Sequence, residues 1–254
     1  MRLEPLREHL GETDRPRRPV DRLVLLVSDR VEEDGPLDGG VLAVTVLASA
    51  LGVAGTDVYA VVARSGTQIG FAVVAVAFLA VAGDRSRYVK LRWPTLEDVG
   101  WIVALPFVLL PVGAGLNVLL PAVGVPTPSA SHAVEGTKAI LIDRPVLWAV
   151  AIPGLYLFAA PAEELLYRGI VQGRLRPHLG TGGVILVSAV AFGLMHAVVF
   201  AFSAPEHFVY SLVSIGASGA VWAVVYERTE NLAVTAVNHA MSWTVPFAAL
   251  FPFA

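Results

Sequence analysis

The chain has 254 residues, of which 56% are hydrophobic and only 15% are charged, whereas soluble domains carry about 25% charged residues. Its formal net charge is −3 and it has no basic stripe, which argues against a nucleic-acid partner. Cysteine is absent, so disulfides, thiolate metal sites and a cysteine nucleophile are excluded.

The charged side chains are unevenly distributed. Residues 1–39 hold 17 of them, although the whole chain has only 18 basic and 21 acidic residues. We therefore expect a polar, flexible cytosolic arm over residues 1–39 and a transmembrane domain over residues 40–254. The arm lacks the basic start and apolar core of a secretory signal.

Seven stretches are apolar over, or nearly over, the ~20 residues that a helix needs to cross a membrane. They predict an all-α fold, a polytopic transmembrane helical bundle of about seven spans. Pro106 and Pro111 predict a kink in the third. The polar stretch 122–144 is interpreted as a long loop, with room for a short helix or an eighth span. The predicted spans are 41–63, 66–83, 99–121, 146–167, 182–203, 207–226 and 231–251.

The positive charges predict an orientation. Of the 18 Lys and Arg residues, 15 fall in the N-terminal arm and in the loops near 84–98, 168–181 and 227–230. Because cytoplasmic segments are enriched in positive charge, this side should be cytoplasmic. We expect an integral protein of the cell membrane, in contact with lipid, with its N-terminus inside and its C-terminus outside.

The fourth predicted span contains Glu163, Glu164 and Arg168. Glu164 and Arg168 are four residues apart, the favoured spacing for an ion pair on a helix. Glu163 lies about 100° away around the helix and is left to face something else. A charge at the centre of a membrane costs ~3 kcal/mol, so such residues are functional candidates. The plain alternative is a cytoplasmic anchor, with Arg168 reaching the headgroups.

Two histidines, His196 and His239, lie in later apolar segments, and Phe192 shares a helical face with His196. Each histidine taken alone is as well explained by a neutral, packed ring. Carboxylates and buried imidazoles together are the groups that hydrolytic chemistry uses. Straight, upright helices would place Glu163 and the two histidines at different depths, so their meeting requires tilted helices or a later start of the fifth span.

Three motifs occur in order and together resemble the CPBP (Abi, type II CAAX endopeptidase-like) intramembrane metalloprotease family. The segment Ala-Pro-Ala-Glu-Glu-Leu-Leu-Tyr-Arg-Gly at 160–169 is similar to its EExxxR motif. Residues 192–196 match its FxxxH motif, and Asn231-Leu232 followed by His239 resembles its third motif. The resemblance covers a core at about residues 145–245.

This resemblance implies a polytopic, usually eight-helix enzyme whose site lies inside the bilayer. Some members remove the C-terminal tripeptide of prenylated proteins, whereas others have other roles, including bacteriocin immunity. The family pattern assigns water activation to Glu163 and His196, and makes His239 an oxyanion donor or metal ligand. It gives supporting roles to Glu164, Arg168 and Phe192.

One position departs from the family. Its third motif has Asn or Asp four residues after the histidine, and this chain has Trp243. An indole cannot ligate a metal, but it carries one N–H donor. A donor role could therefore pass to Trp243, Ser242 or Asn238, or Trp243 could simply pack, and the departure also favours an inactive member.

The cofactor is left open. Glu163, His196 and His239 are the candidate ligands of a metal, with zinc as the candidate ion, because two histidines and a glutamate suit zinc with an open position for water. The chain has no HExxH motif, which slightly favours catalysis without a metal.

We therefore expect an intramembrane endopeptidase, glutamate-dependent or metal-dependent, that hydrolyses a peptide bond with a water activated by Glu and His. Its partner would be a peptide or protein substrate, which in this family can be lipidated. Two alternatives stay open: a non-catalytic membrane protein that binds a peptide as an immunity factor or scaffold, and a proton-coupled transporter. The transporter is less favoured because no repeated halves are visible.

Overall fold

The structure is a computed structural model that describes residues 56, 66–127, 141, 143–203 and 207–244. All regular elements within these residues are helices, which confirms the predicted all-α class. The N-terminal arm with its boundary near residue 39, the span expected at 41–63 and most of the loop expected at 122–144 lie outside the described residues.

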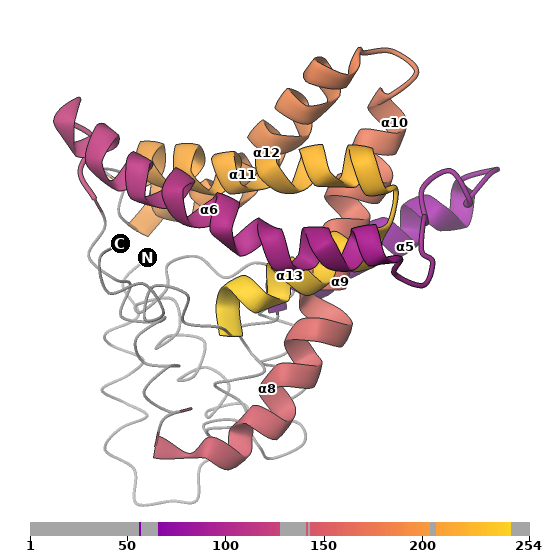
Figure 1. Ribbon diagram of the computed structural model, residues 1–254, viewed down its shortest axis with the longest axis horizontal. Coiled ribbons are helices and arrows are strands. Elements are labelled where there is room, and N and C mark those ends of the chain that lie inside the picture. The colour runs from indigo at the N-terminus through magenta and orange to yellow at the C-terminus, as the bar shows by residue number, and fades with distance from the viewer. Residues whose placement is uncertain (1–55, 57–65, 128–140, 142, 204–206, 245–254) are drawn as a thin grey trace, which may run out of the picture. The chain divides into compact units, whose positions relative to one another are not determined.

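The described elements are all helices, and Figure 1 shows their arrangement. The first described helices are α5 (Gly66–Val81) and α6 (Leu96–Ala122), and the last are α11 (Thr181–Ser203), α12 (Phe208–Thr229) and α13 (Leu232–Thr244). Between them lies one helical run at 145–175. It consists of η1 (Pro145–Leu147), α8 (Trp148–Gly154), η2 (Leu155–Ala159), α9 (Ala160–Glu164), η3 (Leu165–Gln172) and α10 (Gly173–Leu175).

The chain divides into two compact units, residues 1–70 with 130–151 and residues 71–129 with 152–254. In the described part of the first unit, Leu141, Leu147 and Ala151 form a small core with Trp148. The second unit carries all the site residues expected from the sequence. Its main core consists of Leu105, Tyr167, Phe192, Trp222, Val225 and Val234.

Three helices of the described part are long and apolar enough to cross a membrane, judged by length and composition. They are Leu96–Ala122, Pro145–Leu175 and Phe208–Thr229. The helices Gly66–Val81 and Thr181–Ala197 are apolar but shorter. The chain is therefore treated as an integral membrane protein, while the number of seven or eight spans and the cytoplasmic N-terminus stay predictions.

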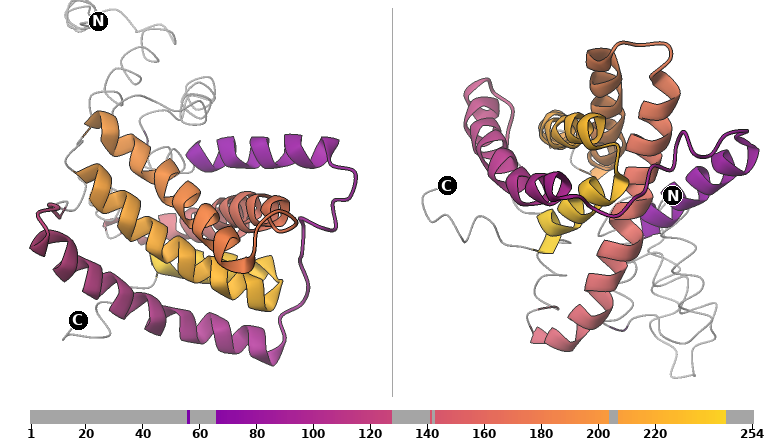
Figure 2. Two further views of the ribbon diagram at one scale, coloured as in Figure 1. Left: turned by 90° about the horizontal axis from the view of Figure 1, so that it is seen from above. Right: turned by 45° about the vertical axis from the view of Figure 1, so that its right-hand side comes forward.

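Helix α6 begins at a well-defined cap. The Thr95 hydroxyl accepts from the backbone N–H of Asp98, and the Asp98 carboxylate accepts in return from the backbone N–H of Thr95 at 2.8 Å. This reciprocal pair satisfies two donors that a helix start leaves open. The helix then continues through Pro106 and Pro111, each of which removes a helical hydrogen bond, and it is visibly curved (Figure 2, right).

The helix of the two glutamates is longer than predicted. It was expected to end at residue 167 and continues to Leu175. Polar side chains beyond residue 167 suggested a loop, but two of them, Arg168 and Gln172, are buried. Gln172, for example, is 1% exposed and donates to Glu227 at 2.8 Å. Arg168 is fully buried, so it must be removed from the fifteen charges assigned to the cytoplasmic side.

Helices α11 and α12 are antiparallel neighbours, and the segment from α9 to α10 crosses α12 at a steep angle (Figures 1 and 2). Close approach of α11 and α12 depends on glycine. A Cβ atom on Gly193 would lie 2.5 Å from the Leu212 carbonyl oxygen and 2.9 Å from the Gly216 nitrogen. Small residues at such crossings let two backbones pack closely in membranes.

The junction of α12 and α13 fixes where the last helix begins. Glu230 ends α12 in the left-handed region, with φ 47°. The next residue, Asn231, is fully buried, and its side chain donates to the Arg92 carbonyl oxygen at 3.1 Å and accepts from the Ala233 N–H at 3.2 Å. The segment that precedes α6 therefore holds the start of α13, eight residues before His239.

Candidate active site

Four ionisable side chains from three helices meet inside the second unit. Glu163 and Glu164 come from α9, His196 from α11 and His239 from α13. The side chains of both glutamates are 0% exposed and that of His239 is 3% exposed, whereas that of His196 is 26% exposed. The cluster is thus buried on the glutamate side and is open beside His196.

Glu163 lies at the centre of this cluster. Its Oε2 atom is 3.4 Å from His196 Nε2 and 3.8 Å from His239 Nε2. Upright helices were expected to place Glu163, His196 and His239 at different depths, but in the structure these three side chains meet. The helix of Glu163 extends to Leu175, and α11 begins at Thr181, so both side chains lie more than three turns from the connection between their helices.

Glu164 is held from two sides. Its Oε1 atom is 2.9 Å from His239 Nδ1, and its Oε2 atom is 3.2 Å from Arg168 Nε. The ion pair predicted from the four-residue spacing is therefore present, between two side chains that are 0% exposed. The two adjacent glutamates differ in their contacts: Glu164 bridges a cation and an imidazole, and Glu163 faces two imidazoles.

Arg168 is an internal cation and not a membrane anchor. Its Nη2 atom donates to the Gly219 carbonyl oxygen at 3.1 Å. Its guanidinium carbon lies 4.6 Å from the ring centre of Phe192 and 5.6 Å from that of Trp222. Contact with aromatic faces and a carbonyl compensates a cation that water does not reach.

The hydrogen-bond partners assign the histidine tautomers. His196 Nδ1 lies 2.8 Å from the Phe192 carbonyl oxygen, which can only accept, so Nδ1 carries the hydrogen. His239 Nδ1 faces Glu164 and is assigned as the donor to that carboxylate. In the neutral rings both Nε2 atoms are then acceptors, and both are directed at the carboxylate of Glu163.

Aromatic rings fix the two imidazoles. Phe192 has its ring centre 4.5 Å from that of His196 and 5.7 Å from that of His239. Trp222 stacks on His239 with centres 4.3 Å apart and planes 27° apart. The indole N–H of Trp222 donates to Asn238 Oδ1 at 2.8 Å, which fixes the plane of the stack.

Sequence reasoning missed Trp222 because it belongs to none of the three motifs. It missed Gly219 as well. A Cβ atom there would lie 2.9 Å from the Phe192 ring, so the glycine provides space for that ring. The run of small residues Gly-Ala-Ser-Gly-Ala at 216–220 is a signal for close helix packing and could have identified this contact.

Trp243 lies beside His239, with ring centres 4.5 Å apart, and is 39% exposed. The other two groups considered as replacements for the family's Asn or Asp are engaged elsewhere. Ser242 Oγ donates to the His239 carbonyl oxygen at 2.6 Å, and Asn238 Nδ2 donates to the Ile102 carbonyl oxygen at 3.3 Å. The described contact of Trp243 is made through its ring.

The fit of a metal was tested on the donors themselves. Within the residues that the structure describes, no group of three or more His, Cys, Asp or Glu side chains is arranged to hold a metal ion. Glu163, His196 and His239 approach one another, but not as such a group, so the metalloprotease part of the expectation lacks support.

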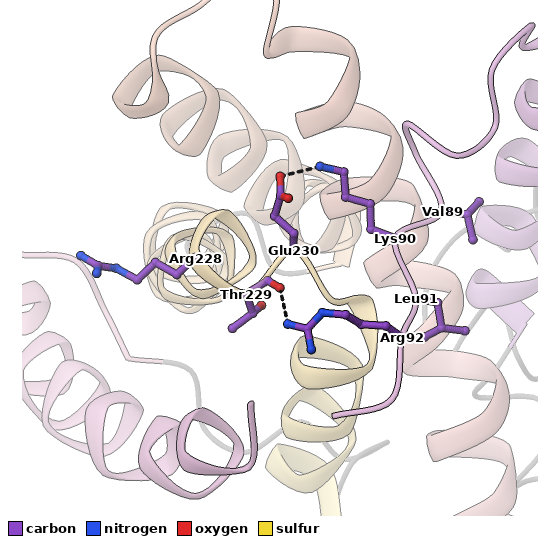
Figure 3. Close-up of a pocket in the computed structure, with 7 residues that line it drawn as sticks. All are labelled: Val89, Lys90, Leu91, Arg92, Arg228, Thr229 and Glu230. Atoms are coloured by element: carbon purple, nitrogen blue, oxygen red, sulfur yellow. Dashed lines mark hydrogen bonds and ion pairs between the residues drawn. The ribbon is translucent and has the colours of Figure 1, made fainter. Parts of the chain in front are cut away.

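A pocket of about 460 Å³ lies elsewhere, at the junction of α12 and α13 (Figure 3). It includes none of the predicted site residues. Lys90 donates to Glu230 at 2.5 Å, and this hydrogen bond lowers the pKa of the Glu230 carboxyl group below its usual value. Arg92 donates to the Thr229 carbonyl oxygen at 2.9 Å. These pairings hold the junction together.

Fold and site together define a helical membrane protein with a buried glutamate–histidine centre. Residues 145–245 match the profile of a family described as type II CAAX prenyl endopeptidase Rce1-like. That segment carries all the predicted site residues, and its match agrees with the resemblance that the three motifs indicated. No curated protein and no solved structure matches the chain.

Proposed function

We propose that this protein is an intramembrane endopeptidase that hydrolyses a peptide bond with a water held by Glu163 and His196. The observation that carries the proposal is the approach of two imidazole Nε2 atoms to one buried carboxylate oxygen, at 3.4 and 3.8 Å. The description of the matching family, a prenyl endopeptidase, supports the same class of reaction.

The proposed mechanism begins at the two acceptors. A water between the Glu163 carboxylate and His196 Nε2 donates one hydrogen bond to each, which leaves an oxygen lone pair free for attack. Glu163 removes a proton as the water oxygen attacks the carbonyl carbon, and it later delivers that proton to the leaving amine. General acid–base catalysis of this kind contributes about 10²–10⁴ in rate.

His239 has a different part in the proposal. Its Nδ1 atom donates to Glu164, so a second proton can reside only on Nε2. The Glu164 carboxylate then stabilises the imidazolium, and Nε2–H becomes a donor to the oxyanion of the tetrahedral intermediate. Arg168 pairs with Glu164 and orients its carboxylate, which makes both of them positioning residues.

The proposed substrate class is a peptide or protein that carries a lipid near the bond to be cleaved. A prenylated C-terminal CaaX segment is the candidate that the family description names. The chain suits an amphiphilic substrate, because its cluster lies among apolar helices and opens beside the partly exposed His196.

The test is the Glu163→Gln variant in proteoliposomes with a farnesylated, fluorescence-quenched CaaX peptide as probe. Glutamine preserves the shape of the side chain but removes the base, so cleavage should fall by about 10²-fold or more. Glu97→Gln is the matched control, because Glu97 is exposed at the start of α6. Full activity of Glu163→Gln would exclude the proposed mechanism. A wild-type protein that binds but never cleaves the peptide would favour the non-catalytic alternative.

A further inference from the structure

One buried polar group beside the cluster has no part in the mechanism above. Tyr167, in η3, is 2% exposed, and its hydroxyl group is buried without a hydrogen-bond partner among the described residues. Burying a hydroxyl group without a partner costs stability, and phenylalanine would fill the same space without that cost. A role in the reaction would explain why this position holds tyrosine and not phenylalanine.

Tyr167 shares two aromatic neighbours with His196. Its ring centre is 5.9 Å from that of Phe71 and 5.1 Å from that of Phe192. The same two rings contact His196, with centre distances of 6.5 Å and 4.5 Å. Tyr167 also follows Glu163 by four residues and so lies on the same helix face. Tyr167 is thus linked to His196 through two shared ring neighbours and to Glu163 through one helix face.

The chemistry of the cluster leaves a need for a donor. The Glu163 carboxylate and the Nε2 atom of His196 are both acceptors, which suits a water but not an oxyanion. Only an Nε2-protonated His239 offers a donor among the groups assigned so far. Oxyanion sites gain from more than one donor, and a phenol O–H is a neutral donor that needs no prior protonation.

We propose that Tyr167 is a further catalytic residue, whose hydroxyl group donates a hydrogen bond to the oxyanion of the tetrahedral intermediate. The inference rests on the proposed function. The hydroxyl group keeps its proton throughout, and its hydrogen bond strengthens as the carbonyl oxygen gains negative charge. The proton that moves is the one that Glu163 takes from water and returns to the leaving amine.

The Tyr167→Phe variant tests this proposal, because it removes one oxygen atom and keeps the ring contacts. With the farnesylated CaaX peptide in proteoliposomes, kcat should fall by about 10²–10³-fold, the loss typical of one oxyanion donor, while KM stays near the wild-type value. The melting temperature in detergent should stay unchanged or rise, because the removed hydroxyl group has no hydrogen-bond partner within the part of the chain that the structure describes.

Tyr156→Phe is the matched control. The Tyr156 hydroxyl group lies 2.9 Å from Thr244 Oγ1, so its removal breaks a hydrogen bond outside the cluster. This variant should keep its kcat and lose melting temperature. The two substitutions are chemically identical, and the proposal predicts opposite patterns for them: activity lost without loss of stability at Tyr167, and stability lost without loss of activity at Tyr156.

A Tyr167→Phe enzyme with near wild-type kcat would overturn the inference. A marked fall in its melting temperature together with its activity would do the same, since the hydroxyl group would then support the fold. Failure of the proposed function is distinguishable, because Glu163→Gln would then be active or the wild-type protein inert. If Glu163→Gln is inactive and Tyr167→Phe is active, only the role of Tyr167 is wrong.

Discussion

At the scale of single residues, two adjacent glutamates have different surroundings because the helix turns by about 100° per residue. Glu164 lies between Arg168 and His239, and Glu163 faces the Nε2 atoms of both histidines. The cation thus pairs with one carboxylate, and in the proposed function the other carboxylate acts as the base. This contrast is the reason for treating the pair as one base and one positioning group.

Arg168→Ala should lower the stability of the folded protein and not only its rate of peptide cleavage. The substitution removes the cation that pairs with the buried Glu164 carboxylate, and it removes the Arg168 hydrogen bond to the Gly219 carbonyl oxygen. Breaking a buried ion pair by removing one partner costs about 3–5 kcal/mol. The melting temperature in detergent measures this, with Arg174→Ala as the control, since Arg174 is exposed on the same helical run. Equal melting temperatures for the two variants would contradict a structural role of the pair.

Residue spacing alone predicted the Glu164–Arg168 pair, because both partners lie on one helix. It did not predict that Glu163 faces both His196 and His239, since that depends on how three helices cross. Trp222 was beyond sequence reasoning for another reason. Its stack on His239 involves no charge and no motif spacing, so nothing distinguished it from an ordinary core tryptophan.

At the scale of the elements, helix type was predictable and helix ends were less so. The apolar stretch at 99–121 became α6 at Leu96–Ala122, close to expectation, because Thr95 and Asp98 form a local cap. The end predicted at residue 167 was wrong by eight residues. Polar side chains normally mark a loop, but here Gln172 is buried against α12, an interaction that a local reading of sequence cannot show.

Gly193→Ala should weaken the packing of α11 on α12. The added methyl group would lie 2.5 Å from the Leu212 carbonyl oxygen, so one backbone must move. Overpacking of this kind costs about 1–3 kcal/mol. His196 lies about one turn after Gly193 on α11, so the shift would also displace its side chain. A lowered melting temperature and lowered cleavage are therefore expected together. Gly182→Ala is the control, because a Cβ atom there has no neighbour within 4 Å. A Gly193→Ala protein as stable as the control would show that the crossing tolerates a methyl group.

At the scale of the whole molecule, the orientation in the membrane stays a prediction from charge. With Arg168 buried, the positive residues assigned to the cytoplasmic side still far outnumber the three on the other side, Arg64, Lys138 and Arg144. The described helices that are long enough to cross a membrane agree with stretches found by hydropathy. The total number of spans depends on segments outside the described residues.

Single-cysteine labelling tests the orientation directly, because the chain has no cysteine of its own. We expect Asp84→Cys to be protected from a membrane-impermeant maleimide in intact cells and Arg144→Cys to be labelled. Both positions are exposed to solvent, so each should react after the membrane is permeabilised. The reverse pattern in intact cells would place the N-terminus outside, against the charge asymmetry.

The two π-helical segments, η2 and η3, lie immediately before and after the five residues of α9 that carry both glutamates. Each π turn accommodates one residue more than an α turn would, and such turns are frequent at functional sites. Deleting one residue from η3 would restore ordinary helical phase and rotate the glutamates by about 100° relative to the part of the run that packs against α12. An alignment that tolerated a one-residue gap there would therefore join sequences whose carboxylates face different neighbours. In this chain the length of the segment after the glutamates thus bears on which neighbours the two carboxylates face, which the motif letters alone do not specify.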